Sequence, residues 1–339
     1  MDIQVSYFVS CLFSLLLVAV VLSMITFLKH KKSYSKTKEE LPPGQMGLPW
    51  IGETMEFYNA QRKNKLFEEF VQPRIRKYGN IFKTRLMGSP TVVVNGADAN
   101  RFFLSNEFKL VISSWPSSSV ELMGKQSIME KHGERHRWLR GIIGTSLGYA
   151  GLERLVPKIC NSVQLHLKTE WHGKEKIISL YRSTKILMFT VVFQCLLGIK
   201  VEPGMLETFE RVLEGVFAPP IKLPGSKFSR ARKARREIEK LLLKAVRQKR
   251  KEKMMMEEGR FEWQEDDDGT LMSRLVGGMI EGKISEEEVV DNAVLLAFAA
   301  HDTTSYAIAM TFRMLAHHPH CYSLLVQEHV DIMSKKIAG

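Results

Sequence analysis

Cysteine is scarce in this chain: its 339 residues include four, at Cys11, Cys160, Cys195 and Cys321. They lack the paired spacing of a zinc site and the density of a disulfide framework, so we expect reduced, structural thiols. Acidic residues are outnumbered, with 37 Asp and Glu against 49 Lys and Arg. Hydrophobic residues, in contrast, make up 45% of the chain, which excludes disorder throughout.

The excess of positive charge is concentrated in one stretch. Residues 222–253 contain fourteen Lys or Arg and three acids. Apolar residues recur within it at helical spacing, at Ile238, Leu241, Leu242, Ala245 and Val246. This pattern predicts a helix with a buried face and a cationic face. The cationic face is either plainly solvated or contacts a membrane surface or an acidic partner. Nucleic-acid binding is not expected, because no binding motif accompanies the charges.

A membrane anchor is predicted at the N-terminus. Residues 7–28 carry no charge, and as a helix they would span about 33 Å, enough to cross a bilayer. Five lysines follow between positions 29 and 38, so the positive-inside rule places residues 1–6 in the lumen and the remainder in the cytosol. A cleaved signal peptide is the alternative, but it would have a basic front and a shorter apolar core.

Residues 29–53 form a basic linker and a Pro-rich hinge, which begins at Leu41-Pro42-Pro43-Gly44. We expect a stiff connector whose Leu48, Trp50 and Ile51 pack against the globular part. Beyond it, spacing predicts a helix over 65–78 and two strands, at 81–86 and 91–94. The remaining sequence is typical of helices. The fold class is therefore mainly α with a small β-sheet near the N-terminus, in one domain over 54–339.

One long central helix is predicted from Ser285 to His318. Ser285 and Glu288 form a capping box, and Pro319 ends the helix after about 50 Å. Its sequence is apolar on all sides between 289 and 314, so we expect it to pass through the core. A second membrane span is the alternative, but Asp302, Arg313 and several hydroxyls would be costly in lipid.

Polar residues interrupt this helix at Ala299-Ala300-His301-Asp302-Thr303-Thr304-Ser305. From the residues alone, an ordinary buried acid with hydroxyls bonded back to the helix is as good a reading as a site. The segment resembles the oxygen-activation motif of the cytochrome P-450 family. That resemblance implies that Asp302 and Thr303 deliver protons to dioxygen at a haem iron, with Ala299 and Ala300 over the haem face. The family more often has Gly at position 300.

A second segment, residues 133–140, is similar to the family helix whose Trp-x-x-x-Arg pair binds a haem propionate; here the two positions are His136 and Arg140. The resemblance also implies substrate contacts from the loop over 111–125, from 217–224 and from the central helix. The expected apolar wall, each member of which could equally be plain core, consists of Trp115, Leu122, Met123, Leu296 and Phe298.

The resemblance implies a haem-dependent monooxygenase that takes electrons from NADPH through a reductase and hydroxylates a hydrophobic small molecule. The anchor, the hinge and the two motifs are similar to plant-type microsomal members that act on triterpenoid, sterol-like and other terpenoid substrates. We accordingly expect a single-pass protein of the endoplasmic reticulum membrane with its catalytic part in the cytosol.

The family's later motifs are absent from these 339 residues. They are Glu-x-x-Arg after the central helix and Phe-x-x-Gly-x-Arg-x-Cys-x-Gly, whose cysteine is the axial iron ligand. None of the four cysteines has that setting, so no metal ligand is assigned, and we expect the haem not to be retained by this chain. The alternatives are an inactive truncated product or incomplete gene model, at most a membrane-tethered binding fragment, and a helical membrane-tethered binding protein unrelated to the family.

Overall fold

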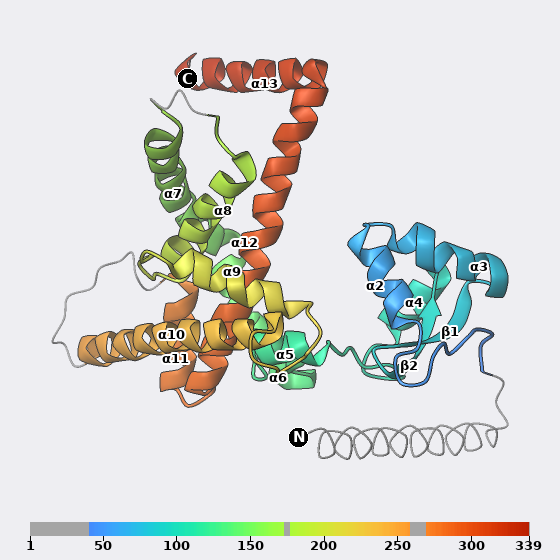
Figure 1. The fold of residues 1–339 in the computed structure, drawn as a ribbon. Helices are drawn as coiled ribbons and strands as arrows, with labels where there is room; N and C mark the ends of the chain where they lie inside the picture. Colours follow the sequence, from blue (N-terminus) through green and yellow to red (C-terminus); the bar gives the residue numbers. More distant parts are fainter. Residues whose placement is uncertain (1–40, 173–176, 258–268, 339) are drawn as a thin grey trace, which may run out of the picture. The chain divides into compact units, whose positions relative to one another are not determined.

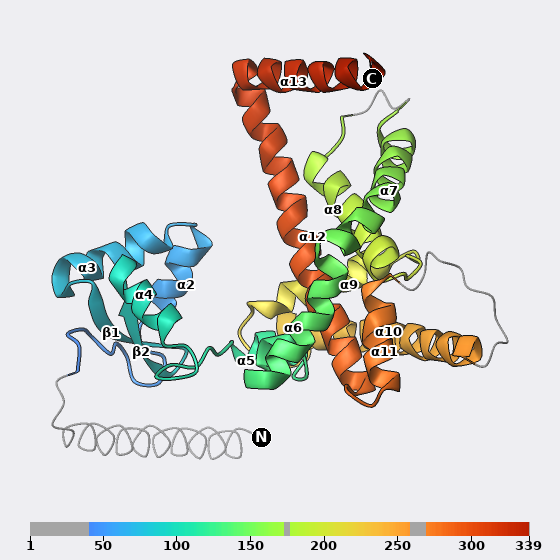
Figure 2. The same ribbon diagram turned by 180° about the vertical axis from the view of Figure 1, so that it is seen from behind.

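The computed structural model describes residues 41–172, 177–257 and 269–338. The predicted anchor at 7–28 and the linker lysines lie outside the described residues. The chain separates into two compact units that divide between Ile112 and Ser113 (Figures 1 and 2). The single domain expected over 54–339 stays a prediction, and each unit is described by itself.

The first unit contains the small sheet. Strands β1 (Ile81–Leu86) and β2 (Ser89–Val94) pair antiparallel, with Ile81 opposite Val94, around a turn at Met87 and Gly88. Its helical elements are α2 (Thr54–Arg62), η1 (Leu66–Val71), α3 (Gln72–Tyr78) and α4 (Ala97–Ser105). The predicted strand pair and the helical stretch over 65–78 are confirmed. The first turns of that stretch, η1, are π-helical.

The hinge lies along the edge of β1. Lys83 donates its amide to the Pro43 carbonyl at 2.9 Å, and a Cβ at Gly44 would come within 2.0 Å of the Lys83 carbonyl oxygen, so glycine is required there. The expectation that Leu48, Trp50 and Ile51 pack against the globular part is wrong: they are 66%, 57% and 50% exposed. A tight turn between Leu48 and Gly52 directs these side chains outward.

The second unit is helical throughout its described residues. Its elements are α5 (Ser117–Met123), η2 (Ile128–Glu130), α6 (Gly133–Leu147), α7 (Tyr149–His166), η3 (Leu167–Trp171), α8 (Leu180–Thr190), η4 (Val191–Leu196), α9 (Met205–Val216), α10 (Lys227–Glu257), α11 (Leu271–Ile280), α12 (Glu286–His317) and α13 (Pro319–Ala338). Helix α12 runs the length of this unit, and α10 crosses it near its start (Figures 1 and 2). Cys160, Cys195 and Cys321 are free thiols in these helices, as expected.

The core of this unit lies between α8, η4, α9, α10, α11 and the first half of α12. The apolar stripe predicted for α10 is confirmed, because Ile238, Leu242 and Val246 are all buried. Helices α9 and α10 approach closely at Gly215, where a Cβ would lie 2.2 Å from the Ala231 Cβ. Only a residue without a side chain permits this crossing.

Helix α12 begins with the predicted capping box. Ser285 Oγ accepts from the Glu288 amide at 3.1 Å, and Glu288 Oε2 accepts from the Ser285 amide at 2.9 Å. We expected α12 to pass through the core along its whole length; this is confirmed for its first half and wrong for its second half. Residues such as Val289 and Ala293 are buried, but in the second half Phe312 and Met314 are 47% and 50% exposed. Contacts with α10 lie near its start, and those with α8 lie around its middle.

Among the described helices, α12 alone has the length and apolar composition of a membrane span. Core helices of soluble proteins often have both properties, and the first half of α12 is buried within this unit.

Candidate functional site

The motif residues of α12 divide between two sides of the helix. Leu296, Ala299, Ala300 and Thr303 follow the spacing that places residues on one face. Ala299 and Thr303 are exposed, and the other two are half-buried. The Thr303 hydroxyl donates to the Ala299 carbonyl at 2.6 Å, which leaves its oxygen free to accept a hydrogen bond. The small side chains allow a large flat group to approach the backbone here.

Asp302 points toward α8 instead. Its carboxylate accepts a hydrogen bond from the Tyr181 hydroxyl at 3.2 Å and lies 3.7 Å from Lys185 Nζ. Successive residues of a helix are turned by about 100°, so Asp302 and Thr303 leave α12 in different directions. The predicted acid and alcohol are therefore neighbours in sequence but face different surroundings, because the acid contacts side chains of α8.

The ion pairs around Asp302 extend to α9. Lys185 lies 3.1 Å from Glu210, and Arg182 lies 2.9 Å from both Glu210 and Glu207. Burial acts to raise the pKa of Glu210, but the hydrogen bonds and charges of Lys185 and Arg182 outweigh it, and the pKa is lowered. Burial likewise acts to lower the pKa of Lys185, and its acidic partners raise it overall. Both groups are therefore charged at neutral pH.

His301, between these two sides, is fully buried. Its ring meets the edges of Phe189 and Phe209, with centroids 5.8 Å and 6.0 Å away. Neither ring nitrogen has a hydrogen-bond partner among the described residues. Burial lowers the pKa of His301, only partly opposed by the charge of Asp302, so its imidazole is neutral at neutral pH.

Hydroxyl groups fix the crossing of α8 and α12. Thr184 donates to the Ser305 carbonyl at 3.2 Å, and Ser305 Oγ donates to the Thr184 carbonyl at 3.4 Å. The sequence offered no signal for Tyr181, Thr184 or Lys185, because they lie more than a hundred residues from the motif they contact.

The predicted propionate-binding pair lies on α6, where His136 and Arg140 are one turn apart. His136 is half-buried and Arg140 is exposed, and neither has a polar partner within the described ranges. Their neighbour Arg135, which sequence reasoning missed, pairs with Glu288 at 2.8 Å and so ties α6 to the start of α12. A free guanidinium on a fixed helix is suited to a carboxylate.

The predicted substrate wall does not gather in one place. Trp115 is 51% exposed, whereas Leu122 and Met123 are buried in the core, Leu122 beside Gly215 at the crossing of α9 and α10. Leu296 and Phe298 are two residues apart on α12 and therefore point to opposite sides. Whether any of these side chains contacts a substrate stays a prediction.

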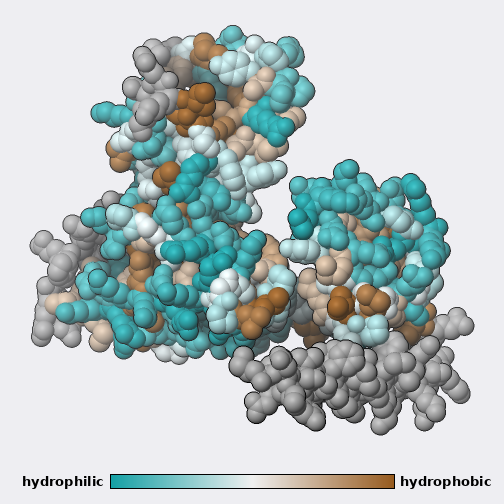
Figure 3. Space-filling view, viewed as in Figure 1, coloured by the Kyte–Doolittle hydropathy of each residue, from teal (hydrophilic) through white to brown (hydrophobic). Residues whose placement is uncertain are grey.

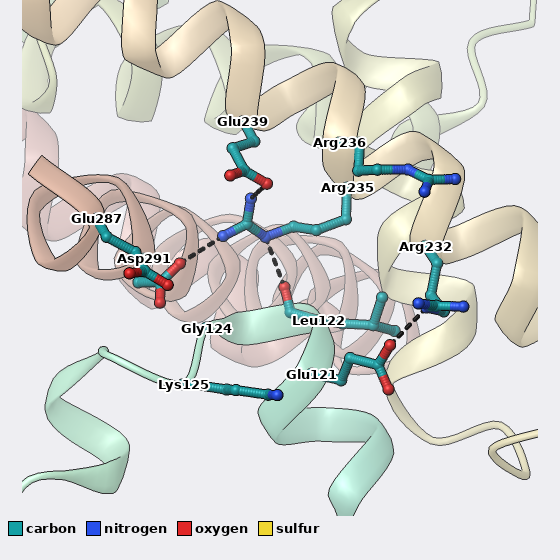
Figure 4. A pocket seen from close by; sticks show the side chains of 10 residues that line it. All are labelled: Glu121, Leu122, Gly124, Lys125, Arg232, Arg235, Arg236, Glu239, Glu287 and Asp291. Atoms are coloured by element: carbon teal, nitrogen blue, oxygen red, sulfur yellow. Dashed lines mark hydrogen bonds and ion pairs between the residues drawn. The ribbon is translucent and has the colours of Figure 1, made fainter.

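A cavity of about 260 Å³ lies between α5, α10 and the start of α12 (Figure 4). Arg235 crosses it, donating to the Leu122 carbonyl at 2.9 Å and pairing with Asp291 at 2.6 Å. Asp291 also accepts the Gln126 amide at 2.9 Å. A Cβ at Gly124 would lie 2.2 Å from Asp291 Cγ, so glycine is needed beside this carboxylate.

The charged lining of this cavity is a poor match for an apolar substrate. Burial raises the pKa of Asp291, while the Gln126 amide and Arg235 act to lower it. Arg235 and Asp291 instead clamp the end of α5 to α10 and α12. The segment that carries Leu122 and Met123 is thereby held in place.

Two separate sets of these residues each suit a part of a haem. The open, small-residue face around Ala299 would accept a flat macrocycle, and the free donors on α6 suit its carboxylates. A group of three or more His, Cys, Asp or Glu able to hold a metal ion does not occur in the part of the chain that the structure describes. Cys195 is buried beside Ser162, and Cys160 and Cys321 are exposed on α7 and α13. We therefore assign no thiolate ligand.

Comparison with known proteins is consistent with these features. A model of the cytochrome P-450 family matches residues 42–337. Taxoid 14-beta-hydroxylase of Taxus cuspidata is 33% identical over 94% of this chain and 62% of its own length. Beta-amyrin 28-monooxygenase of Barbarea vulgaris is 29% identical over 95% of this chain and 66% of its own length. The chain thus spans less than two thirds of these curated relatives.

A solved structure has the same fold. Cyanobacterial CYP120A1 with bound retinoic acid superposes with a TM-score of 0.69 and 29% sequence identity. The match covers 84% of this chain and 61% of that one.

Proposed function

The chain belongs to the cytochrome P-450 family, and we propose on that premise that it forms the oxygen-binding side of a haem monooxygenase acting on a polycyclic terpenoid. One observation carries the proposal: α12 presents an open face of small residues, with the Thr303 hydroxyl on it. An ordinary core helix would fill this face with large apolar side chains.

In this proposal the haem, when bound, supplies the activation of dioxygen. His136 and Arg140 would hold its propionates, since both are free donors on one side of α6. Ala299 and Ala300 would lie over its face. These roles follow the family motif, residue by residue, and the exposure of Ala299 and Arg140 supports them.

Thr303 would hold a proton at the reacting side. Its Oγ1 donates to the Ala299 carbonyl and can accept a hydrogen bond from the open side of the helix. Asp302 would be the acid partner of Thr303 that the family motif implies, and Tyr181 and Lys185 keep its carboxylate ordered on the α8 side. Transfer between the two requires the Asp302 side chain to turn away from Lys185.

The substrate class rests on the relatives. Two of them are named for oxidising a taxoid and beta-amyrin, which are both polycyclic terpenoids. By family we further propose electrons from NADPH through a reductase. The uncharged run at 7–28 supports an anchor in the endoplasmic reticulum membrane with the catalytic part in the cytosol.

A chimera tests this proposal. The chain is joined after residue 338 to the remaining length of taxoid 14-beta-hydroxylase and expressed in microsomes with a reductase. We expect a thiolate-type carbon monoxide band and NADPH-dependent hydroxylation of at least one member of a taxoid and triterpene panel. A folded chimera that has the band but oxidises only fatty acids or small aromatics would contradict the substrate class.

The 339-residue chain expressed alone is the companion measurement. It should give no thiolate-type band under carbon monoxide, since none of its four cysteines has the setting of an axial ligand. A normal thiolate band from this chain would show that one of those cysteines binds iron and would overturn our assignment.

A further inference from the structure

His301 has no role in the proposed site, although it stands within the motif of α12. Its side chain is fully buried, and both ring nitrogens lack a hydrogen-bond partner among the described residues. Burying such polar atoms costs free energy that an apolar side chain would not cost. Stability therefore does not explain why a ring with two nitrogens lies here, and its effect on the neighbouring residues has to be considered.

The His301 ring lies in a narrow socket between α8, α9 and α12. Phe189 of α8 and Phe209 of α9 stand nearly perpendicular to it, at 86° and 85°, with ring centroids 5.8 Å and 6.0 Å away. The two phenyl rings are 5.7 Å from each other, and both are buried. In a closely packed interior a side chain enclosed in this way cannot turn without displacing its neighbours. The socket therefore fixes the direction in which His301 leaves α12.

His301 is also the last large buried side chain of α12. After Ala297, the buried residues of this helix are His301 and Ser305. Further along, Phe312 and Met314 are exposed, and Figure 3 shows apolar surface at the end of the helical unit that contains α13. The rotation of the motif segment about the helix axis therefore depends on His301 more than on any residue that follows it.

This rotation sets the directions of Asp302 and Thr303. Successive residues of a helix are turned by about 100°, so Asp302 and Thr303 stand about 100° and about 200° from His301. With the His301 ring in the core, Thr303 faces almost directly away from the core and Asp302 faces sideways. The structure has this order, because His301 is buried, Asp302 is half-buried against α8 and Thr303 is exposed.

The charges around the socket leave the ring neutral. Lys185 of α8 opposes a proton on His301, whereas Glu210 of α9 and Asp302 of α12 favour one, and Arg182 of α8 pairs with Glu210. Burial is the largest effect, and the pKa of His301 is lowered overall. Because the ring is uncharged at neutral pH, what it contributes there is its shape. An uncharged side chain of similar size should be able to replace it.

We propose that His301 is a positioning residue: seated between Phe189 and Phe209, it holds the motif segment of α12 at the rotation that directs Thr303 to the open face and Asp302 to α8. His301 acts through these two residues, so its effect on catalysis rests on the proposed function. The rotation itself does not depend on haem or substrate and can be measured without them.

Alkylation of a thiol at position 303 measures the rotation in the full 339-residue chain. Thr303→Cys is made alone or with a second substitution, and the rate at that peptide is read by mass spectrometry. Because position 303 faces away from the socket, a turn of the segment brings it toward neighbouring elements. We expect His301→Ala, which empties the socket, to slow alkylation several-fold. His301→Met, which fills the socket, should leave the rate unchanged.

Val246→Ala is the control for a general loss of packing. Val246 is buried in the apolar stripe of α10, and its truncation should leave the alkylation rate at position 303 unchanged. A loosened helix would not slow alkylation of a thiol that is already exposed, so only a turn of the segment gives the expected result. An unchanged or faster rate with His301→Ala would overturn the proposal.

The chimera with taxoid 14-beta-hydroxylase measures the catalytic consequence. His301→Ala should lower the product formed per NADPH oxidised several-fold while the carbon monoxide band and the substrate Kd are retained, because the open face stays accessible and only the motif is turned. His301→Met should keep most of the ratio. Phe209→Leu widens the socket from α9 and should lower the ratio without any change in α12.

The outcomes of the two measurements are distinguishable. If the wild-type chimera hydroxylates nothing, the proposed function fails, whereas the alkylation rates still decide whether His301 sets the rotation. A product ratio for His301→Ala equal to that of the wild type would contradict the positioning role. Equal losses in His301→Ala, His301→Met and Val246→Ala would also contradict it, because stability alone would then explain the effect.

Discussion

Asp302 and Thr303 are consecutive residues, yet the groups that surround them differ. Thr303 lies on the open face and bonds only to its own helix, whereas Asp302 is bonded by Tyr181 and paired with Lys185. The sequence predicted both residue types for one task, but it gave no information about the α8 side chains that order the acid. A residue motif identifies candidates, and the neighbouring helix decides their orientation.

His301 gives a pH prediction. Its folded pKa is lowered by burial, so the unfolded chain takes up a proton that the folded chain does not. The contribution of the neutral His301 ring to the free energy of unfolding is therefore complete above the ordinary His pKa. It is lost as the pH decreases from that pKa toward the lowered pKa of the folded state. We expect the free energy of unfolding to decline as the pH falls below about 6.5, the ordinary pKa of His, and His301→Met to flatten that decline. Urea unfolding at several pH values measures it.

Two comparisons make this test specific. His320→Gln, on the exposed surface of α13, should leave the pH profile unchanged. At about pH 8 the His301→Met chain should be as stable as the wild type or more so, because it removes unpaired buried nitrogens. A His301→Met profile that still falls like the wild type would mean that other groups carry the decline.

Helices were predictable where one segment contains its own signals. The capping box of α12, the apolar stripe of α10 and the two strands follow from local spacing and caps. What covers each helix is a long-range matter. The exposure of Phe312 and Met314 depends on which distant elements pack around the second half of α12, so spacing alone misplaced these two residues.

The clamp between α5, α10 and α12 gives an element-level prediction. Arg235 and Asp291 have side chains that are 8% and 7% exposed. Arg235→Met would leave the Asp291 carboxylate buried without its charge partner, so we expect a loss of about 3 kcal/mol of unfolding free energy. Hydrogen exchange at the Gln126 amide should accelerate, since that amide is bonded to Asp291.

Matched variants separate this clamp from its surroundings. Arg236 lines the same cavity but is exposed. Arg236→Met should therefore change the free energy of unfolding by less than about 0.5 kcal/mol. Arg235→Met combined with Asp291→Asn should be less destabilised than Arg235→Met alone, because no charge is left unpaired. Equal losses for Arg235→Met and Arg236→Met would show that burial of the pair is unimportant.

Considered whole, the helical unit carries two features on separate helices. The small-residue face of α12 suits a cofactor, and the outer face of α10 carries exposed basic side chains. The family fold and the helix order were predictable from sequence, because the motifs lie at characteristic places along the chain. Which basic side chains of α10 form ion pairs was not predictable from the sequence, because the acidic partners lie on other elements of the folded protein.

The central claim is that one face of α12, marked by Thr303, meets the reacting oxygen. It is tested most directly by the product formed per NADPH oxidised in the chimera with taxoid 14-beta-hydroxylase, for Thr303→Ala and Thr304→Ala. Thr304 is also exposed but is turned about 100° from Thr303. We predict that Thr303→Ala lowers the ratio several-fold and that Thr304→Ala leaves it unchanged. Equal ratios in both variants would contradict the claim.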